Sequence, residues 1–159
     1  MAEIEAMAER VRQHWRAQGL RVSPVNPEQL AELRRLRPKG IPEEYEAFLR
    51  IAGLPDDEDR EGFRFWLPEE VRATRDVLGE AEYGSDATEP SVIIADYLQE
   101  SWWYGLWLAG PFTGSVSLVL GHGSGKDPQP PMGTFVDFLH AYLHDDARLY
   151  PPASNPRQA

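Results

Sequence analysis

The chain has 159 residues, with 26 acidic side chains against 16 basic ones and a formal net charge of −10. This charge argues against binding to nucleic acid or anionic membranes, which need a basic surface, and no apolar run approaches the roughly 20 residues of a membrane span. Cysteine is absent, which excludes disulfides, thiolate metal sites and a cysteine nucleophile. The first 15 residues lack the pattern of a secretory signal, so a cytoplasmic location is predicted.

Helices are predicted in the first half of the chain. Apolar residues with helical spacing indicate a first helix from about residue 4 to residue 18. Three more helices are marked by a proline followed by glutamates. Proline suits the first helical position, and the acids meet the positive end of the helix dipole. These helices are predicted to begin at Pro27, Pro42 and Pro68, and the last of them to run to residue 78.

Strands dominate the second half. A Gly/Pro-rich loop follows them at 121–133, and Thr134 with Asp137 has the spacing of a capping box at the start of a closing helix. The connections between the last strands are too short for parallel crossovers, so the fold class is predicted as α+β, with a twisted, mostly antiparallel sheet of about four to six strands flanked by helices. One domain is expected over residues 1–150 and a disordered tail over 151–159. The predicted strands are 62–67, 92–96, 102–108 and 115–120.

Two local motifs fit their familiar functions poorly. GHGSGKD at residues 121–127 lacks the glycine spacing of a phosphate loop, and the prolines after it prevent the helix that would hold the phosphate. His140 and His144 are spaced as on a metal-binding helix, but the glutamate of an HExxH motif is absent and a solvated helix surface explains both side chains. The sequence therefore predicts neither a cofactor nor a metal site, and no catalytic residues.

The segment VIIADYLQESWWYGLWL, residues 92–108, combines two apolar strands with a polar turn. Strand alternation places Trp103 and Tyr104 on opposite faces, and both faces are apolar. Core packing accounts for most of these rings, although aromatic side chains beside acids are also typical of protein-binding hot spots. Asp96 and Glu100 bracket the turn. Capping of the turn by Asp96 is favoured over a catalytic pair of carboxylates.

The acidic loop at residues 56–61 differs from the other acids, because it does not lie at a predicted helix start. Two interpretations remain open: a solvated loop, or a docking surface for a basic protein, which a negative field would attract. If the loop and the polar turn act together, the predicted contact residues are Asp56, Asp57, Glu58, Asp59, Glu61, Asp96, Glu100, Trp102 and Trp103.

The order and spacing of several segments resemble the SUKH superfamily, which includes a fungal cell-wall assembly regulator and many bacterial immunity proteins. The Ile-Pro helix start in IPEEYEAFLRIAGLP is followed by the aromatic strand and Pro-Glu-Glu of FRFWLPEEV, then by IIADYLQESWWYGLWLAGPFTGSVSLVLG and the closing GTFVDFLHAYLHDDARLY. One departure is the turn PFTGSV, which is longer than the Gly-Pro-x-Val of the family. The resemblance covers about residues 41–150.

The resemblance implies a fold with a twisted sheet and flanking helices, no known catalytic activity, and a cytoplasmic protein that binds and neutralises a cognate toxin. A nuclease toxin must be basic to hold its substrate, which agrees with the net charge of −10. The predicted partner is therefore a basic toxin domain, bound by a monomer or weak homodimer. The alternatives are a small-molecule binder or enzyme that uses a cleft near Asp96 and the strand of Trp102 and Trp103, and a regulatory scaffold.

Overall fold

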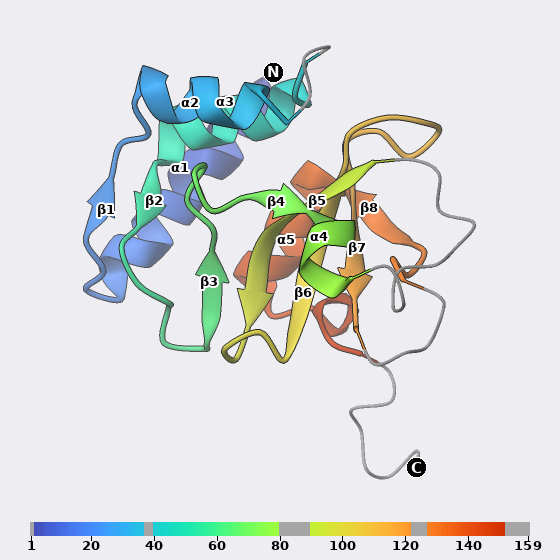
Figure 1. Cartoon of the computed structure of the whole chain (residues 1–159). Coiled ribbons are helices and arrows are strands. Elements are labelled where there is room, and N and C mark those ends of the chain that lie inside the picture. The colour runs from blue at the N-terminus through green and yellow to red at the C-terminus, as the bar shows by residue number, and fades with distance from the viewer. Residues whose placement is uncertain (1, 37–39, 80–89, 122–126, 152–159) are drawn as a thin grey trace, which may run out of the picture.

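The structure of the chain is a computed structural model that describes residues 2–36, 40–79, 90–121 and 127–151. The described residues form an α+β fold, as the sequence predicts (Figure 1). All but the first residue of the predicted tail 151–159, and most of the glycine-rich segment 121–127, lie outside the described residues. In chain order the elements are α1 (Ala2–Ala17), β1 (Val22–Ser23), α2 (Pro27–Arg34), α3 (Glu43–Ala52), β2 (Leu54–Pro55), β3 (Phe63–Phe65), β4 (Arg72–Ala73), α4 (Thr74–Leu78), β5 (Ser91–Tyr97), β6 (Trp102–Trp107), β7 (Ser115–Val119), β8 (Pro131–Thr134), α5 (Phe135–His144) and the short 3₁₀ helix η1 (Ala147–Leu149).

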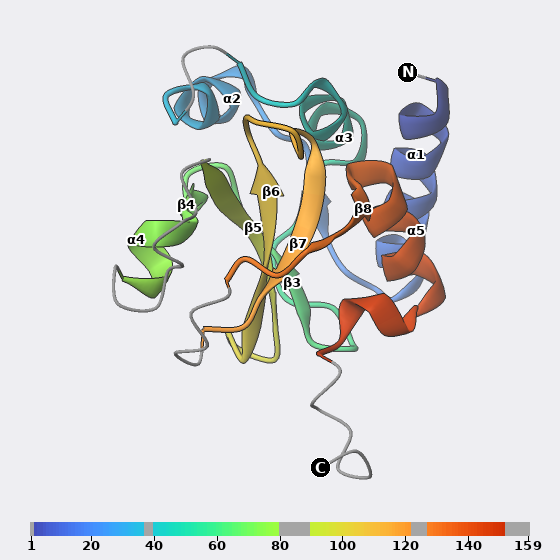
Figure 2. The same ribbon diagram turned by 90° about the vertical axis from the view of Figure 1, so that its right-hand side faces the viewer.

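The main sheet is antiparallel and has the strand order β3-β5-β6-β7-β8, with β4 also paired to β5. Strand β3 pairs with the last residues of β5, and β4 pairs with its earlier residues, so both lie along the same edge of β5. Strands β1 and β2 form a separate two-stranded sheet. Figure 2 shows the main sheet nearly edge-on, with α1 and α5 on one face and α4 on the other. Among the described residues, no helix is both long and apolar enough to cross a membrane.

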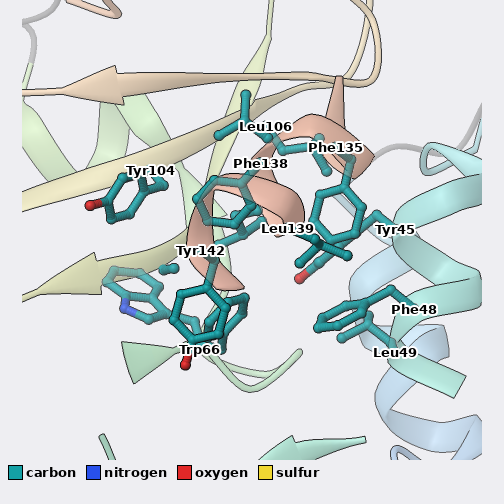
Figure 3. Close-up of a cluster of buried hydrophobic side chains, with 14 of the residues drawn as sticks. Tyr45, Phe48, Leu49, Trp66, Tyr104, Leu106, Phe135, Phe138, Leu139 and Tyr142 are labelled. Carbon is teal, nitrogen blue, oxygen red and sulfur yellow. The ribbon is translucent and has the colours of Figure 1, made fainter. Parts of the chain in front are cut away.

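The core lies between the main sheet and the helices α1, α3 and α5. Phe138 of α5 packs against Tyr104 of β6, with ring centroids 5.2 Å apart, and Phe135 packs against Tyr45 and Phe48 of α3 at 5.4 and 5.3 Å (Figure 3). The capping box predicted at Thr134 is present: its hydroxyl accepts from the Asp137 amide, and the Asp137 carboxylate accepts from the Thr134 amide. This cap fixes the point where β8 ends and α5 turns back across the sheet.

The prediction of a helix that begins at Pro68 is wrong for the first part of that segment. Residues 68–70 form a turn, Arg72–Ala73 pair with β5, and the helix begins only at Thr74. The reason lies in Glu70, whose carboxylate accepts hydrogen bonds from the Leu67 amide at 2.9 Å and from the Arg64 guanidinium, which holds the chain in a turn. Local helix-start chemistry is here overridden by pairing with a central strand.

The structure also contains an edge strand that the sequence pattern does not predict. All of strand β8 except Thr134 lies within the predicted loop 121–133, and the strand pairs with β7, with Thr134 opposite Ser115 and Pro131 opposite Ser117. Proline and glycine mask the strand signal in PMGT, yet proline is tolerated at a sheet edge, where an amide donor is dispensable.

Candidate functional site

Three segments that are distant in sequence meet at one end of the molecule, the lower end in Figures 1 and 2. They are the acidic loop between β2 and β3, the turn between β5 and β6, and the segment from the end of α5 through η1. The Leu98 amide donates to the Gly62 carbonyl at 2.9 Å, which joins the loop to the turn. Gly62 has a φ of +96°, which favours glycine, and a Cβ there would lie 2.7 Å from the tip of the Leu98 side chain, which would have to move.

Asp59 anchors the acidic loop from inside the protein. Its side chain is buried and accepts hydrogen bonds from the amides of Glu61 and Phe63, at 2.8 and 2.9 Å, and from the Tyr142 hydroxyl. The Tyr142 hydroxyl in turn accepts from Trp15 Nε1 at 2.8 Å. Asp59 was predicted to contact a partner, but a buried carboxylate with three donors positions the loop instead, so it leaves the predicted contact set.

Aromatic side chains form the centre of the surface where the segments meet. Tyr97 and Trp102 stack with their centroids 4.7 Å apart, and Tyr150 packs edge-on against them at 5.6 and 6.3 Å. All three are half-buried, and beside them the Leu98 side chain is 50% exposed. Trp102 Nε1 donates to the hydroxyl of Tyr104 at 3.0 Å, which fixes the orientation of the indole. The result is a pre-ordered, partly exposed apolar patch.

Carboxylates border this patch. Glu61 and Asp145 are both exposed, and the Tyr150 hydroxyl donates to Asp145. Burial, and then the charges of Glu61, Asp145 and Asp59, raise the pKa of Tyr97 above its ordinary value. The part of this rise that comes from the three carboxylates reflects the negative charge beside the ring. We call this surface the aromatic–acidic face, and it consists of Glu61, Tyr97, Leu98, Trp102, Asp145 and Tyr150.

Four residues of the aromatic–acidic face were not predicted from the sequence: Tyr97, Leu98, Asp145 and Tyr150. Tyr97 and Leu98 lie within the segment 92–108. A hairpin with a four-residue turn at 98–101 places Tyr97 opposite Trp102, and the observed strand register has this pair. That hairpin pattern was the signal that could have identified Tyr97. No sequence signal places Asp145 and Tyr150 there, because the packing of α5 and η1 across the sheet decides their position.

The remaining acids of the loop, at residues 56–58, precede Asp59 in the chain. Asp56 and Asp57 are exposed and Glu58 is half-exposed. The Asp56 amide donates to the Arg21 carbonyl at 3.2 Å, and Asp57 accepts from the Glu58 amide at 2.8 Å. These three carboxylates form no ion pair with a residue that the structure describes, and their charge is open to a partner.

Asp96 and Trp103 lie opposite each other on the other face of the sheet from Trp102, because successive strand residues point to opposite faces. Glu100, in the turn, is drawn to that side by a bond to Trp103. Trp103 Nε1 donates to Glu100 at 3.0 Å. Asp96 is 1% exposed and accepts from the Glu100 amide at 3.0 Å. The preferred interpretation of Asp96 as the cap of the turn is thus confirmed. The single contact surface predicted for these residues together with Trp102 is divided between two faces, and Asp96 leaves the predicted contact set.

A polar groove of about 320 Å³ lies beside Asp96 and is lined by Arg64, Trp66, Glu69, Glu70, Arg72 and Glu100. The second oxygen of Asp96 accepts from Trp66 Nε1 at 2.6 Å and from Arg64 Nε at 3.2 Å. Glu70 also pairs with Arg64, at 3.0 Å. The two carboxylates are held by fixed donors, an arrangement that suits structural ion pairing better than proton abstraction.

The two histidines of α5 stack on each other with centroids 6.0 Å apart, and His144 Nδ1 lies 2.8 Å from the His140 carbonyl. Within the described ranges, no group of three or more histidine or carboxylate side chains is placed to hold a metal ion.

Comparison with protein-family models, with curated proteins and with solved structures finds no match to this chain.

Proposed function

We propose that this chain is a cytoplasmic, non-catalytic protein-binding domain of the SUKH superfamily, and that it acts as an immunity protein by binding and neutralising a basic toxin domain such as a nuclease. The observation that carries the proposal is the aromatic–acidic face, where stacked, half-exposed rings are bordered by carboxylates. The net charge of −10 and the resemblance of residues 41–150 to that superfamily support the same reading.

The aromatic–acidic face has the composition of a binding hot spot. Tyrosine and tryptophan contribute a large apolar area with few rotatable bonds, and their truncation at the centre of an interface typically costs about 2 kcal/mol or more. Trp102 and Tyr97 are already held by stacking and by the bond to Tyr104, so little side-chain entropy is lost on binding.

The acids at the border select the partner. Arginine and lysine side chains stack favourably over aromatic rings and pair with carboxylates, so a basic protein surface satisfies both parts of the face. A negative field also steers a positively charged partner and raises the association rate. A nuclease domain has such a surface because it must hold phosphate groups. Binding there would cover the surface that the nuclease needs for its substrate.

Co-expression tests this proposal. The probe is the protein encoded beside this chain in its native genome, which the proposal expects to be a toxin domain, produced in bacteria with and without the chain. The wild-type chain is expected to restore growth and to co-purify with the toxin domain, whereas Trp102→Ala is expected to weaken the complex by about 2 kcal/mol, or thirtyfold in Kd.

The matched control is Phe112→Ala. Phe112 is 46% exposed, lies in the loop between β6 and β7 at the opposite end of the sheet, and packs against Trp107. This variant removes an exposed aromatic side chain without touching the face, and it should protect as well as the wild type. Failure of the wild-type chain to bind or protect would reject the proposed function. Equal loss in both variants would reject the face as its site.

A further inference from the structure

Three arginines converge on one pocket on this otherwise acidic protein. Arg12 and Arg16 lie one turn apart on α1, and Arg50 lies in the last turn of α3, the helix that packs against α1. Together with Val22 and Pro24 they line a pocket of about 140 Å³ beside the sheet of β1 and β2. We propose that this pocket binds a small oxyanion, a phosphate group being the best fit. This inference is independent of the proposed toxin binding.

The arginines have unused capacity to bind an anion. Arg12 is oriented by Glu9, at 2.5 Å, and donates to the Ile51 carbonyl at 3.3 Å, while its Nε is buried without an acceptor among the described residues. The guanidinium groups of Arg16 and Arg50 make no hydrogen bond or ion pair with any residue that the structure describes. Among the described residues, Arg12 is thus paired with Glu9, and the charges of Arg16 and Arg50 are left without a carboxylate partner.

Helix dipoles explain only part of this arrangement. Arg16 and Arg50 each lie near the C-terminus of a helix, where a cation is favoured without any ligand. That preference acts on each helix separately. It does not require both side chains to line the same pocket, nor to share it with Arg12, which Glu9 already holds. Arg16 and Arg50 are both exposed, and together with Arg12 they line one pocket from two neighbouring helices. Planar guanidinium groups placed in this way can recognise phosphate in a bidentate manner.

The size of the pocket limits the ligand. Pockets for drug-sized molecules measure about 300–1,000 Å³, and 140 Å³ is well below that range. A phosphate group, free or at the end of an ester, fits this volume, and the rest of a larger ester would lie outside the pocket.

Titration of the purified full chain with inorganic phosphate and, separately, with glycerol 3-phosphate tests the site, with ionic strength held constant by sodium chloride. The readouts are calorimetry and the amide NMR signals of the pocket-lining residues Ala52 and Gly53. Saturable binding of both ligands assigns the site to the phosphate group itself, and binding of the ester alone assigns it to phosphate esters. Binding of neither overturns the proposal.

Matched double variants separate a site from general attraction. Arg16→Gln with Arg50→Gln should weaken phosphate binding by about tenfold or more, since two charge-assisted bonds are lost. Arg10→Gln with Arg60→Gln removes the same charge from exposed positions outside the pocket and should change the affinity by less than about twofold. Equal weakening in the two variants would show that only net charge matters and would overturn the site.

Discussion

Tyr45 has a buried hydroxyl with no hydrogen-bond partner among the described residues, although its ring packs well against Phe135. An unpaired buried hydroxyl costs free energy that a hydrogen atom in its place does not. Tyr45→Phe is therefore expected to raise the free energy of unfolding by about 1 kcal/mol, measured by urea denaturation with tryptophan fluorescence. Tyr104→Phe, the control, removes bonds to the Leu149 carbonyl and to Trp102, and should lower it by about 1 kcal/mol. If Tyr45→Phe destabilises the protein as much, the hydroxyl has a hydrogen-bond partner outside the described residues.

The buried tyrosines also predict how stability depends on alkaline pH. Burial raises the pKa of Tyr45, Tyr104 and Tyr142 above the ordinary value of 10.0. The unfolded chain therefore loses these protons at a lower pH than the folded protein. The contribution of these tyrosines to the free energy of unfolding is complete below about pH 10. Above that pH the free energy of unfolding falls, by up to about 1.4 kcal/mol per pH unit for each tyrosine.

Urea denaturation between about pH 9 and about pH 11 measures this loss, and the absorbance of tyrosinate reports ionisation in the same samples. Tyr45→Phe should reduce the slope by the share of one tyrosine. A slope that is unchanged in Tyr45→Phe, or tyrosinate formation well before unfolding, would show that burial does not control these groups.

At the level of elements, the turn between β5 and β6 is strained. Leu98, Gln99 and Glu100 all adopt positive φ angles, of 47°, 54° and 65°, which non-glycine residues rarely do. The turn is nevertheless held: the Ser101 amide donates to the Tyr97 carbonyl at 2.9 Å, and Asp96 accepts from the Glu100 amide. These hydrogen bonds hold the strained turn in place, and there the Leu98 amide reaches the Gly62 carbonyl of the acidic loop.

Gln99→Gly tests this strain. Glycine adopts positive φ without a steric penalty, which stabilises the folded turn. Its greater conformational freedom in the unfolded chain offsets part of this gain. The free energy of unfolding should therefore rise by about 0.5–1 kcal/mol. Ser101→Gly is the control within the same turn. Ser101 is not among the positive-φ residues and its hydroxyl donates to the Leu98 carbonyl at 2.8 Å, so that variant should lose about 1 kcal/mol. Destabilisation by both glycines to the same extent would mean that the turn carries no strain.

The elements that the sequence predicts well are those whose signals are local. The apolar stripe of α1 and the capping box of α5 both depend on residues within a few positions of each other, and both are found. The misassigned elements depend on distant partners: β4 is a strand because β5 pairs with it, and β8 because β7 does. Pairing of that kind overrides the proline and glycine signals of the segments themselves.

At the scale of the whole molecule, only part of the candidate site could be predicted from the sequence. Composition alone identifies the acidic loop and the aromatic strand as unusual. Their joining through Leu98 and Gly62, the burial of Asp59 and Asp96, and the arrival of Tyr150 depend on tertiary packing. A one-dimensional pattern marks which residues are unusual, and the fold decides which of them face solvent together.

The charge of the molecule leads to a kinetic prediction for the proposed complex. Glu61 and Asp145 border the aromatic rings, so they contribute most strongly to the field that an approaching basic partner meets. Replacing them with Glu61→Gln and Asp145→Asn should lower the association rate with the toxin domain about tenfold at low salt and flatten its dependence on salt, with little change in the dissociation rate. Stopped-flow fluorescence at several sodium chloride concentrations measures both rates.

The control for this prediction removes the same charge elsewhere. Glu3 and Glu43 are exposed in the first turns of α1 and α3. Both helices begin at the end of the molecule away from the aromatic–acidic face (Figure 1). Charges beyond the Debye length of about 10 Å are largely screened at moderate salt, so Glu3→Gln with Glu43→Gln should change the association rate by less than about twofold. Equal slowing in both double variants would mean that overall charge, and no particular face, guides the partner. An association rate that rises with salt would remove the electrostatic basis of the proposed recognition, because steering by opposite charges must weaken as ions screen it.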